Sequence, residues 1–362
     1  MAYSLVNVRR SVLDLSVLND GQSSGEALQT TTALAKRADE LGYTRFWVAE
    51  HHNMPSVACT SPAVLIAHLA ASTSTIRVGS GGVMLPNHAP LVIAEQFAML
   101  AELHPGRIDL GVGRAPGTDQ RTAAVLRRSR QPEGEDDFPR DFLDLMGLLG
   151  DPRTPTGLWN SFNATPAPSS APEIFLLGSS GYSAQLAGHL GLPFAFAHHF
   201  DTGGTMQATE LYHHTFQPSV VLDEPYMIVT ANVLAADSKE DADWHSAPGR
   251  LTSLGRRTGK FIRLPSPQDA AAHPDLELAN QLPSSRIVGE VSTVIRELED
   301  LVTRTEANEL MVTSVAYDLS ARIRSIELLA EHWEGSATSQ DEKSGTAPRA
   351  LSERPLGSSH SS

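Results

Sequence analysis

Hydrophobic positions change their period several times along the first part of the chain. Residues 11–18 alternate between apolar and polar positions, which predicts a β-strand. Ser23 and Glu26 then form a capping-box pattern, and the apolar residues that follow share one helical face. Residues 46–49 are a short continuous apolar run, typical of a strand that is buried on both faces. The three segments predict one β–α–β unit.

The alternation of strand and helix patterns continues through most of the chain. Strands are predicted at 76–85, 108–113, 173–178, 194–197, 226–235 and 309–314, and helices at 61–72, 90–103, 136–149, 183–189, 289–301 and 321–332. Strands that alternate with helices in this way predict a parallel (β/α)8 barrel, the TIM-barrel fold of the α/β class. Two irregular stretches, 114–135 and 255–283, predict insertions after strands four and seven, the second as a loop or lid.

The composition changes near the C-terminal end. From residue 335 onward the only large apolar residues are Leu351 and Leu356, among serine, proline and charged residues. Such a segment cannot bury enough apolar surface to offset the entropy lost on ordering. We therefore expect one barrel domain over 1–334 and a disordered tail over 335–362.

Charge and cysteine content exclude several classes of protein. The 42 acidic residues exceed the 28 basic residues by 14, and no run of Lys or Arg is long enough to follow a nucleic-acid backbone. A single cysteine, Cys59, excludes an internal disulfide framework, and we expect it to be a small buried residue. No apolar stretch has the length of a signal peptide or of a bilayer span. We expect a cytoplasmic protein that binds neither nucleic acid nor membrane.

Polar residues follow directly after two of the predicted strands. Glu50, His51 and His52 follow the strand at 46–49, and His198 with His199 follow the sixth strand. Parallel barrels hold their active sites at these carboxyl ends, so the five residues are expected on one rim. Imidazole and carboxylate also suit zinc or iron, which leaves a metal-dependent hydrolase open. The simpler interpretation is a set of loop histidines without a catalytic role.

Two features suit a phosphate group. The turn Ser179-Ser180-Gly181-Tyr182-Ser183 opens a helix, where free backbone N–H groups, hydroxyls and the helix dipole favour an anion. Arg114 follows a glycine-rich strand and can hold a phosphate with two hydrogen bonds. Because the ends of adjacent strands are neighbours in a barrel, we expect both features to converge on one pocket. Their simpler interpretations are a serine-capped helix and a surface salt bridge.

Two further patterns concern the shape of a ligand pocket. The cluster at 79–82, Gly-Ser-Gly-Gly, lies within the third predicted strand and indicates the close approach of a planar ligand or an unusual peptide geometry. A β-bulge would explain the same glycines. Met54 and Val57 follow the histidine pair and either line a hydrophobic pocket or belong to the core.

Several of these segments together resemble the bacterial luciferase-like monooxygenase family. They are Glu50-His51-His52 after Phe-Trp-Val-Ala, the glycine-rich strand that runs into Leu85-Pro86-Asn87, and the segments at 105–114 and 177–183. The similarity runs in register from about residue 11 to residue 331. It implies a TIM barrel with insertions, and a flavin in place of a metal.

The resemblance also implies roles for individual residues. His51 is similar by position to the catalytic histidine beside the reactive edge of the flavin. Gly81 and Gly82 match a non-prolyl cis peptide that lies against the isoalloxazine ring. The cofactor-phosphate site and the remaining rim residues are assigned in the same way: Arg114, Ser179, Ser180, Tyr182 and Ser183 to the phosphate, and Glu50, His52, His198 and His199 to the rim near the substrate.

The activity implied by the resemblance is a reduced-FMN-dependent monooxygenase that inserts one oxygen atom of O2 into a small organic substrate. Ser179 stands where luciferase has a carboxylate and the lid is only loosely similar, so light emission is not implied. The chain has no Gly-x-Gly-x-x-Gly fingerprint, which predicts that a flavin reductase supplies the reduced FMN. A deazaflavin-dependent hydride-transfer oxidoreductase and a non-catalytic flavin-binding protein are the alternatives, and the family also implies a homodimer.

Overall fold

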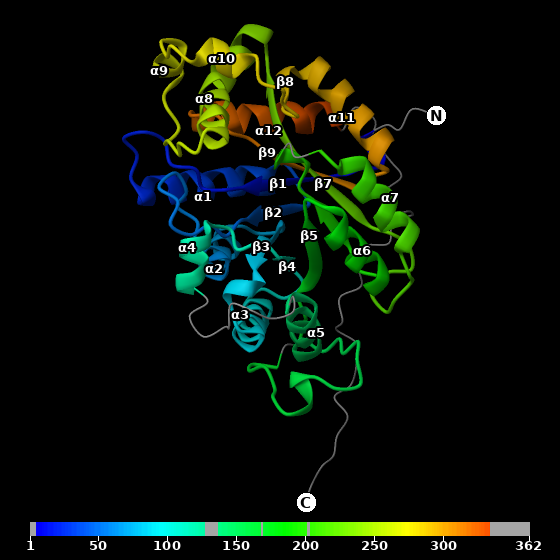
Figure 1. The fold of residues 1–362 in the computed structure, drawn as a ribbon. Helices are drawn as coiled ribbons and strands as arrows, with labels where there is room; N and C mark the ends of the chain where they lie inside the picture. The colour runs from blue at the N-terminus through cyan, green and yellow to red at the C-terminus, as the bar shows by residue number, and fades with distance from the viewer. Residues whose placement is uncertain (1–4, 127–136, 168, 201–202, 334–362) are drawn as a thin grey trace, which may run out of the picture.

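The fold is that of a closed parallel barrel. We analysed a computed structural model, which describes residues 5–126, 137–167, 169–200 and 203–333. The barrel strands are β1 (Arg9–Asp14), β2 (Arg45–Val48), β3 (Arg77–Met84), β4 (Ile108–Gly113), β5 (Glu173–Gly178), β6 (Phe194–Phe196), β7 (Met227–Ala236) and β9 (Glu309–Thr313). Each pairs with the next in this order, and β9 pairs back with β1 (Figure 1). The predicted TIM-barrel fold is confirmed.

Helices surround the barrel on its outside (Figure 1). The helices of the outer layer are α1 (Ser24–Glu40), α2 (Pro62–Ser72), α3 (Pro90–Leu103), α5 (Phe138–Leu148), α6 (Gly181–Leu190), α7 (Thr205–Thr215), α11 (Val291–Thr305) and α12 (Leu319–Trp333). The predicted capping box forms at α1, where the Ser23 hydroxyl accepts from the Glu26 backbone and the Glu26 carboxylate accepts from the Ser23 backbone. The sequence pattern did not predict α7.

The connection after β7 differs from its prediction. The stretch 255–283 is not structureless, because α8 (Lys239–Arg257), α9 (Pro267–Ala271) and α10 (Leu276–Asn280) lie together there (Figure 1). The short strand β8 (Ile287–Glu290) pairs in parallel with the second half of β7, outside the barrel. The pattern assigned part of β8 to a helix because its pairing partner lies more than 50 residues away in the sequence. The connection after β4 carries α4 (Gln120–Leu126) and α5.

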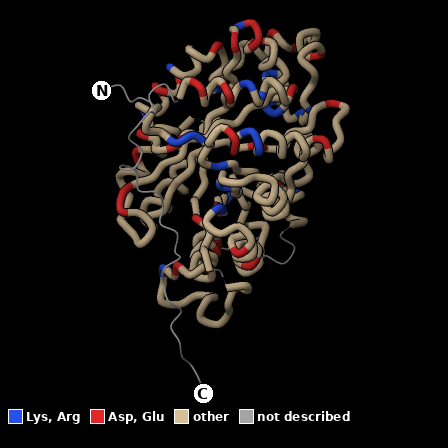
Figure 2. Tube along the Cα trace, turned by 180° about the vertical axis from the view of Figure 1, so that it is seen from behind, with Lys and Arg blue, Asp and Glu red and all other residues tan. Residues whose placement is uncertain are grey.

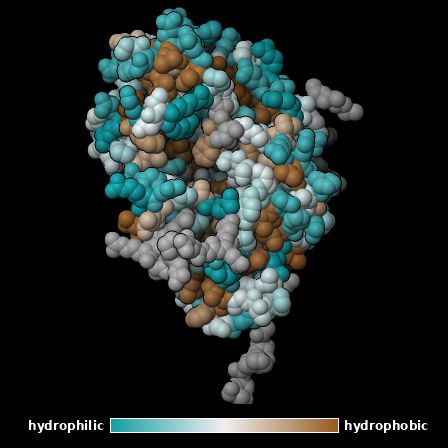
Figure 3. Space-filling view, viewed as in Figure 1, coloured by the Kyte–Doolittle hydropathy of each residue, from teal (hydrophilic) through white to brown (hydrophobic). Residues whose placement is uncertain are grey.

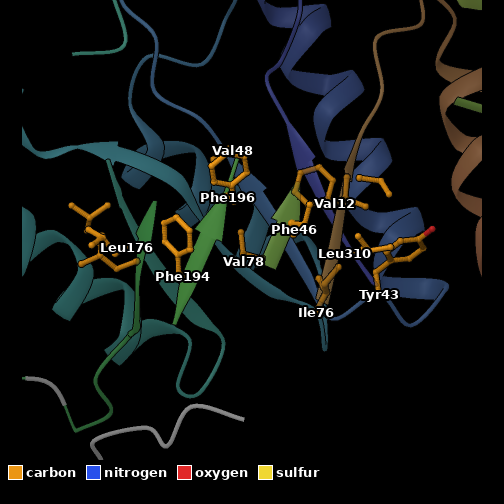
Figure 4. Packing of buried hydrophobic residues seen from close by; sticks show 14 of the residues in the cluster. Val12, Tyr43, Phe46, Val48, Ile76, Val78, Leu176, Phe194, Phe196 and Leu310 are labelled. Atoms are coloured by element: carbon orange, nitrogen blue, oxygen red, sulfur yellow. The ribbon is translucent and has the colours of Figure 1, made fainter. Parts of the chain in front are cut away.

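The core consists of two layers that follow from the two-residue period of the strands. Leu13, Trp47 and Phe175 point into the barrel and pack with other interior residues. Their neighbours Val12 and Phe46 point outward and pack between the barrel and the helices (Figure 4). Cys59 is also buried, as expected, and burial raises the pKa of its thiol to about 12.

A buried ionic network fills the N-terminal end of the barrel, and sequence reasoning missed it. The guanidinium of Arg45, which is 1% exposed, lies 3.0 Å from Asp109, 3.2 Å from Glu173 and 3.0 Å from Glu309. Arg77 also contacts Asp109 and Glu173. Burial raises the pKa of the Asp109 carboxyl, but Arg77 and Arg45 overcome this and leave the pKa below its usual value.

The remaining sequence predictions about organisation have different outcomes. Among the described residues, no helix combines the length and the hydropathy that crossing a bilayer requires. Figure 2 shows acidic and basic positions intermixed along the trace. The predicted tail at 335–362 and residues 127–135 of the first predicted insertion lie outside the described residues. The proposed domain limits therefore stay a prediction.

Candidate active site

A cavity of about 200 Å³ opens at the carboxyl ends of the barrel strands. Most of its wall is apolar and comes from the barrel interior, including Leu13, Trp47 and Met311. Seven of the residues predicted as site residues line it: His51, Gly81, Arg114, Ser179, Ser180, Ser183 and His199. The structure thus brings together segments from β2, β3, β4, β5 and β6 that the sequence places more than 140 residues apart.

One wall of the cavity is backbone that carries no side chains. The peptide between Gly81 and Gly82 is cis, which confirms the geometry implied by the resemblance, and the register between β3 and β4 shifts at this point, as in a β-bulge. A Cβ atom on Gly81 would lie 2.8 Å from Leu13 Cδ1, and one on Gly82 would lie 2.2 Å from Leu177 Cδ1 and 2.8 Å from the Gly111 carbonyl oxygen. At Gly82 the Gly111 backbone leaves no room for a Cβ atom, whereas at Gly81 the Leu13 side chain would have to shift; Gly82 lies behind Gly81 without lining the cavity.

One part of the cavity wall carries the predicted phosphate features, and they converge as expected. Arg114 follows β4, and its guanidinium carbon lies 4.2 Å from the centre of the Tyr182 ring at the start of α6. Ser180 is the N-cap of α6, and its hydroxyl makes no capping hydrogen bond. Ser179 and Ser183 line the same end. Tyr182 supports Arg114 and does not itself line the cavity.

His51 stands at the end of β2 and faces the cavity. Its backbone N–H donates to the Cys59 carbonyl oxygen at 3.2 Å, which fixes the start of the loop. Its buried Nδ1 atom has no hydrogen-bond partner among the described residues. Burial lowers the pKa of His51, although the charge of Glu50 opposes this. The imidazole is therefore neutral at neutral pH and presents its ring to the cavity.

His199 faces the same cavity from the turn after β6. Burial lowers the pKa of His199 to about 3, against a hydrogen bond with the Thr230 backbone and with further lowering by Arg256. Its Nδ1 atom is buried and, like that of His51, has no partner in the described part of the chain. Two neutral imidazoles therefore meet at one place, and both also line a second, adjoining cavity.

Glu50 and His52 do not lie on the cavity wall, which corrects the prediction of a shared rim. The Glu50 side chain is fully buried and accepts hydrogen bonds from His52 Nε2 at 2.7 Å, His88 Nε2 at 2.9 Å and Asn87 Nδ2 at 3.1 Å. Burial raises the pKa of Glu50, but the hydrogen bond and charge of His88 overcome this and leave it lowered. Glu50 turns away because side chains alternate along an extended chain, so it joins the ends of β2 and β3.

The two histidines after β6 also differ in direction, and only one of them faces the cavity. His198 directs its Nδ1 atom to the Thr205 hydroxyl at 2.8 Å, whereas His199 faces the cavity. Among the described residues, no group of three or more His, Cys, Asp or Glu side chains is arranged to hold a metal ion. Of the four histidines that suggested a metal site, His52 is bonded to Glu50 and His198 to Thr205, whereas His51 and His199 face the cavity.

The second cavity has a volume of about 410 Å³ and adjoins the first. The two share Leu15, His51, His199 and Phe200 as lining residues. Met54 and Val57 both line the second cavity, and Val57 also packs against the core, so the pocket and core positions that the sequence left open are both present. His51 and His199 therefore separate a glycine-walled cavity from a larger one that is bordered by α8 and the loop after it.

Comparison with known proteins identifies the class to which this fold and site belong. Residues 8–305 match the luciferase-like monooxygenase family. A luciferase-like monooxygenase of Escherichia coli K12 is 44% identical over 88% of this chain and 95% of its own length. The chain belongs to the luciferase-like monooxygenase family and is an enzyme of that family.

Solved structures extend the comparison to the fold. The apo structure of MsnO8 is 36% identical and has a TM-score of 0.83, over 91% of this chain and 98% of the other. The oxygenating constituent of 3,6-diketocamphane monooxygenase of Pseudomonas putida, solved in complex with FMN, has a TM-score of 0.66 at 21% identity, over 90% of this chain and 97% of the other. The latter likeness concerns the fold alone.

Proposed function

We propose that this protein is a reduced-FMN-dependent monooxygenase that inserts one oxygen atom of O2 into a small organic substrate. The observation that carries the proposal is the convergence of a glycine wall, an anion-binding turn and a neutral histidine on one cavity. These parts match the parts of FMN, which has a flat ring system at one end and a phosphate at the other. The side chains that line the cavity thus fit this cofactor.

The phosphate would lie against Arg114 and the start of α6. There the Ser180 hydroxyl, the first backbone N–H groups of the helix and the guanidinium all offer donors to an anion. The ring system would lie on the backbone at Gly81, where the absence of a Cβ atom leaves a flat surface. A similar fold is known with FMN bound, and the double histidine after Glu50 resembles the FMN-dependent branch of the family.

In the reaction, the bound reduced flavin supplies the electrons that activate O2. The chain contributes an apolar wall, including Leu13, Trp47 and Met311, which would limit the access of water to the reacting atoms. His51 holds a neutral imidazole at the boundary of the two cavities, so it can accept a proton there and return it. Glu50 fixes the loop that carries His51 through its bonds to His52, His88 and Asn87.

Two partners belong to the proposal. The sequence offers no nicotinamide-binding fingerprint, which supports a separate flavin reductase as the source of reduced FMN. The family resemblance supports a homodimer, and light scattering during size-exclusion chromatography measures its mass. A purely monomeric chain in that measurement contradicts the dimer and leaves the cofactor assignment untouched.

The proposal is tested by anaerobic titration of the full chain with reduced FMN, followed by admission of air while absorbance is recorded. We expect one reduced FMN to bind per chain and its oxidation by O2 to be slower than in free solution. The His51→Ala variant should still bind reduced FMN but change the oxidation rate, whereas His189→Ala, on the exposed end of α6, should change neither. Binding of a reduced deazaflavin in place of reduced FMN overturns the proposal in favour of the hydride-transfer alternative.

A further inference from the structure

The second cavity has an unusual charge for this protein. Its wall includes Arg256 and Arg286, and none of the described residues that line it is acidic. The whole chain carries 14 more acidic than basic residues, so the basic lining of this cavity is opposite in sign to the net charge of the protein. The electrostatic field of the cavity therefore favours an anion.

The helix α8 holds Arg286 in place. Gly249, Ser253 and Arg256 are spaced by four and three residues, so they share one face of α8. Arg286, just before β8, packs on this face: its Nη2 donates to the Ser253 hydroxyl at 2.9 Å. A Cβ atom on Gly249 would lie 2.6 Å from Arg286 Nη1. The glycine thus makes room for the guanidinium, which lies close against the helix backbone.

Two other arginines of α8 bind the segment around α10. Arg250 donates to Asn280 Oδ1 at 2.9 Å, and Arg257 donates to the Pro283 carbonyl oxygen at 2.7 Å. Both bonds tie α8 to the segment around α10. Arg250 and Arg257 line a small side cavity of about 30 Å³ and not the large one, whereas Arg256 and Arg286 line both. The two pairs of arginines therefore have separate positions in the fold.

The rest of the large cavity is mostly apolar. Met54, Val57 and Val315 line its inner part, toward His51 and His199. Phe261 and Ile262, in the loop after α8, also line it, although 55% and 40% of their surfaces are exposed. Figure 3 shows hydrophobic surface in a recess near the middle of the viewed face. Such a cavity, basic on one side and apolar elsewhere, matches an amphiphilic molecule.

We propose that this cavity binds the substrate, and that the substrate is a small organic anion with an aliphatic part. Its carboxylate or similar head group lies on Arg286 and Arg256, because a planar guanidinium binds such a group with two parallel hydrogen bonds. The aliphatic part runs over Met54 and Val57 and presents the atom to be oxidised beside His51. This inference rests on the proposed function for the chemistry, but the anion-binding cavity itself does not depend on it.

The test compares two ligands of equal chain length by isothermal titration calorimetry on the full chain without cofactor. Octanoate carries the anionic head and 1-octanol does not, so the ratio of their dissociation constants isolates the charge. We expect octanoate to bind about tenfold or more tightly, the effect of one good charge-assisted hydrogen bond. Arg286→Gln should remove this preference while leaving 1-octanol binding unchanged.

Two more variants separate a local effect from a general one. Gly249→Ala keeps both arginines but places a methyl group against the Arg286 guanidinium, so it should reduce the octanoate preference. Arg304→Gln changes the net charge equally at an exposed position on α11, where Arg304 pairs with Asp300, and should leave the preference as it is. Circular dichroism of each variant verifies that it is folded.

Equal affinity of the wild-type chain for octanoate and 1-octanol overturns the inference, as does an equal loss for both ligands in Arg286→Gln. Titration of the same proteins with reduced FMN separates this result from the proposed function. A chain that prefers octanoate but does not bind reduced FMN keeps the anion site and loses the proposed function. A chain that binds reduced FMN without preferring octanoate loses the anion site alone.

Discussion

Arg114 offers the sharpest test of how the cofactor is held. The perturbation is Arg114→Gln, which removes the charge above the Tyr182 ring but keeps a polar side chain. Two unit charges about 4 Å apart attract by roughly 1 kcal/mol in water and roughly 4 kcal/mol at a protein surface of lower effective dielectric. Arg114 is exposed, so we take about 2 kcal/mol for its attraction to a phosphate. The loss of this attraction corresponds to an increase of about 30-fold in the dissociation constant of FMN.

The assay compares FMN with riboflavin, which has the same ring system and no phosphate. In anaerobic titrations at low ionic strength, we expect Arg114→Gln to weaken the binding of reduced FMN about 30-fold. The binding of reduced riboflavin should hardly change. Arg121→Gln, with an equal charge change on α4, is the matched control and should affect neither ligand. An equal loss for both flavins would refute the reasoning, because Arg114 would then act on the ring pocket or on the fold.

Three further predictions concern the cavity wall, the barrel and the second histidine. Gly82→Ala should weaken FMN binding, because its Cβ atom would lie 2.8 Å from the Gly111 backbone carbonyl oxygen and the backbone behind Gly81 would have to shift; binding equal to wild type in the same titration contradicts this. Arg45→Met should destabilise the fold by about 3–5 kcal/mol in urea unfolding, because it removes the counter-ion of the buried Glu309 and leaves Asp109 and Glu173 with Arg77 alone; a change under 1 kcal/mol would show that the network is dispensable. His199 stabilises the fold fully above pH 6.5, and this is lost as the pH falls toward its folded pKa of about 3, with a slope of up to about 1.4 kcal/mol per pH unit. His199→Gln should flatten that slope in unfolding curves recorded from pH 7 to pH 4, and parallel slopes would contradict the assignment.

The two adjoining cavities of the candidate active site differ in the residues that line them. The first has a glycine wall and the serine-rich turn at the start of α6, and the second has two arginines and an apolar floor. His51 and His199 lie where the cavities meet. A cofactor held in one and a substrate held in the other would meet beside these imidazoles, which burial keeps neutral.

Local sequence determined the features that depend on local physics. The two-residue period of the strands and the capping box at Ser23 come from neighbouring residues alone, and the structure has both. The ends of β4 and β5 were expected to bring Arg114 and the turn at Ser179 together, because adjacent strands of a parallel barrel end on the same face. The cis peptide at Gly81 was implied by the family resemblance in the same stretch.

The tertiary structure decided what depends on segments far apart in the chain. Glu50 was predicted on the rim beside His51, but its carboxylate points to His88, and only the packing of β2 against β3 sets that direction. The pairing of β8 with β7 and the position of Arg45 among three carboxylates are long-range contacts without a local pattern. Arg286 lies more than 30 residues from Ser253, and its place in the second cavity likewise comes from the fold. The sequence period predicted the barrel strands and most of the helices, but not α7 or β8, whereas side-chain direction and partner depend on how the elements pack.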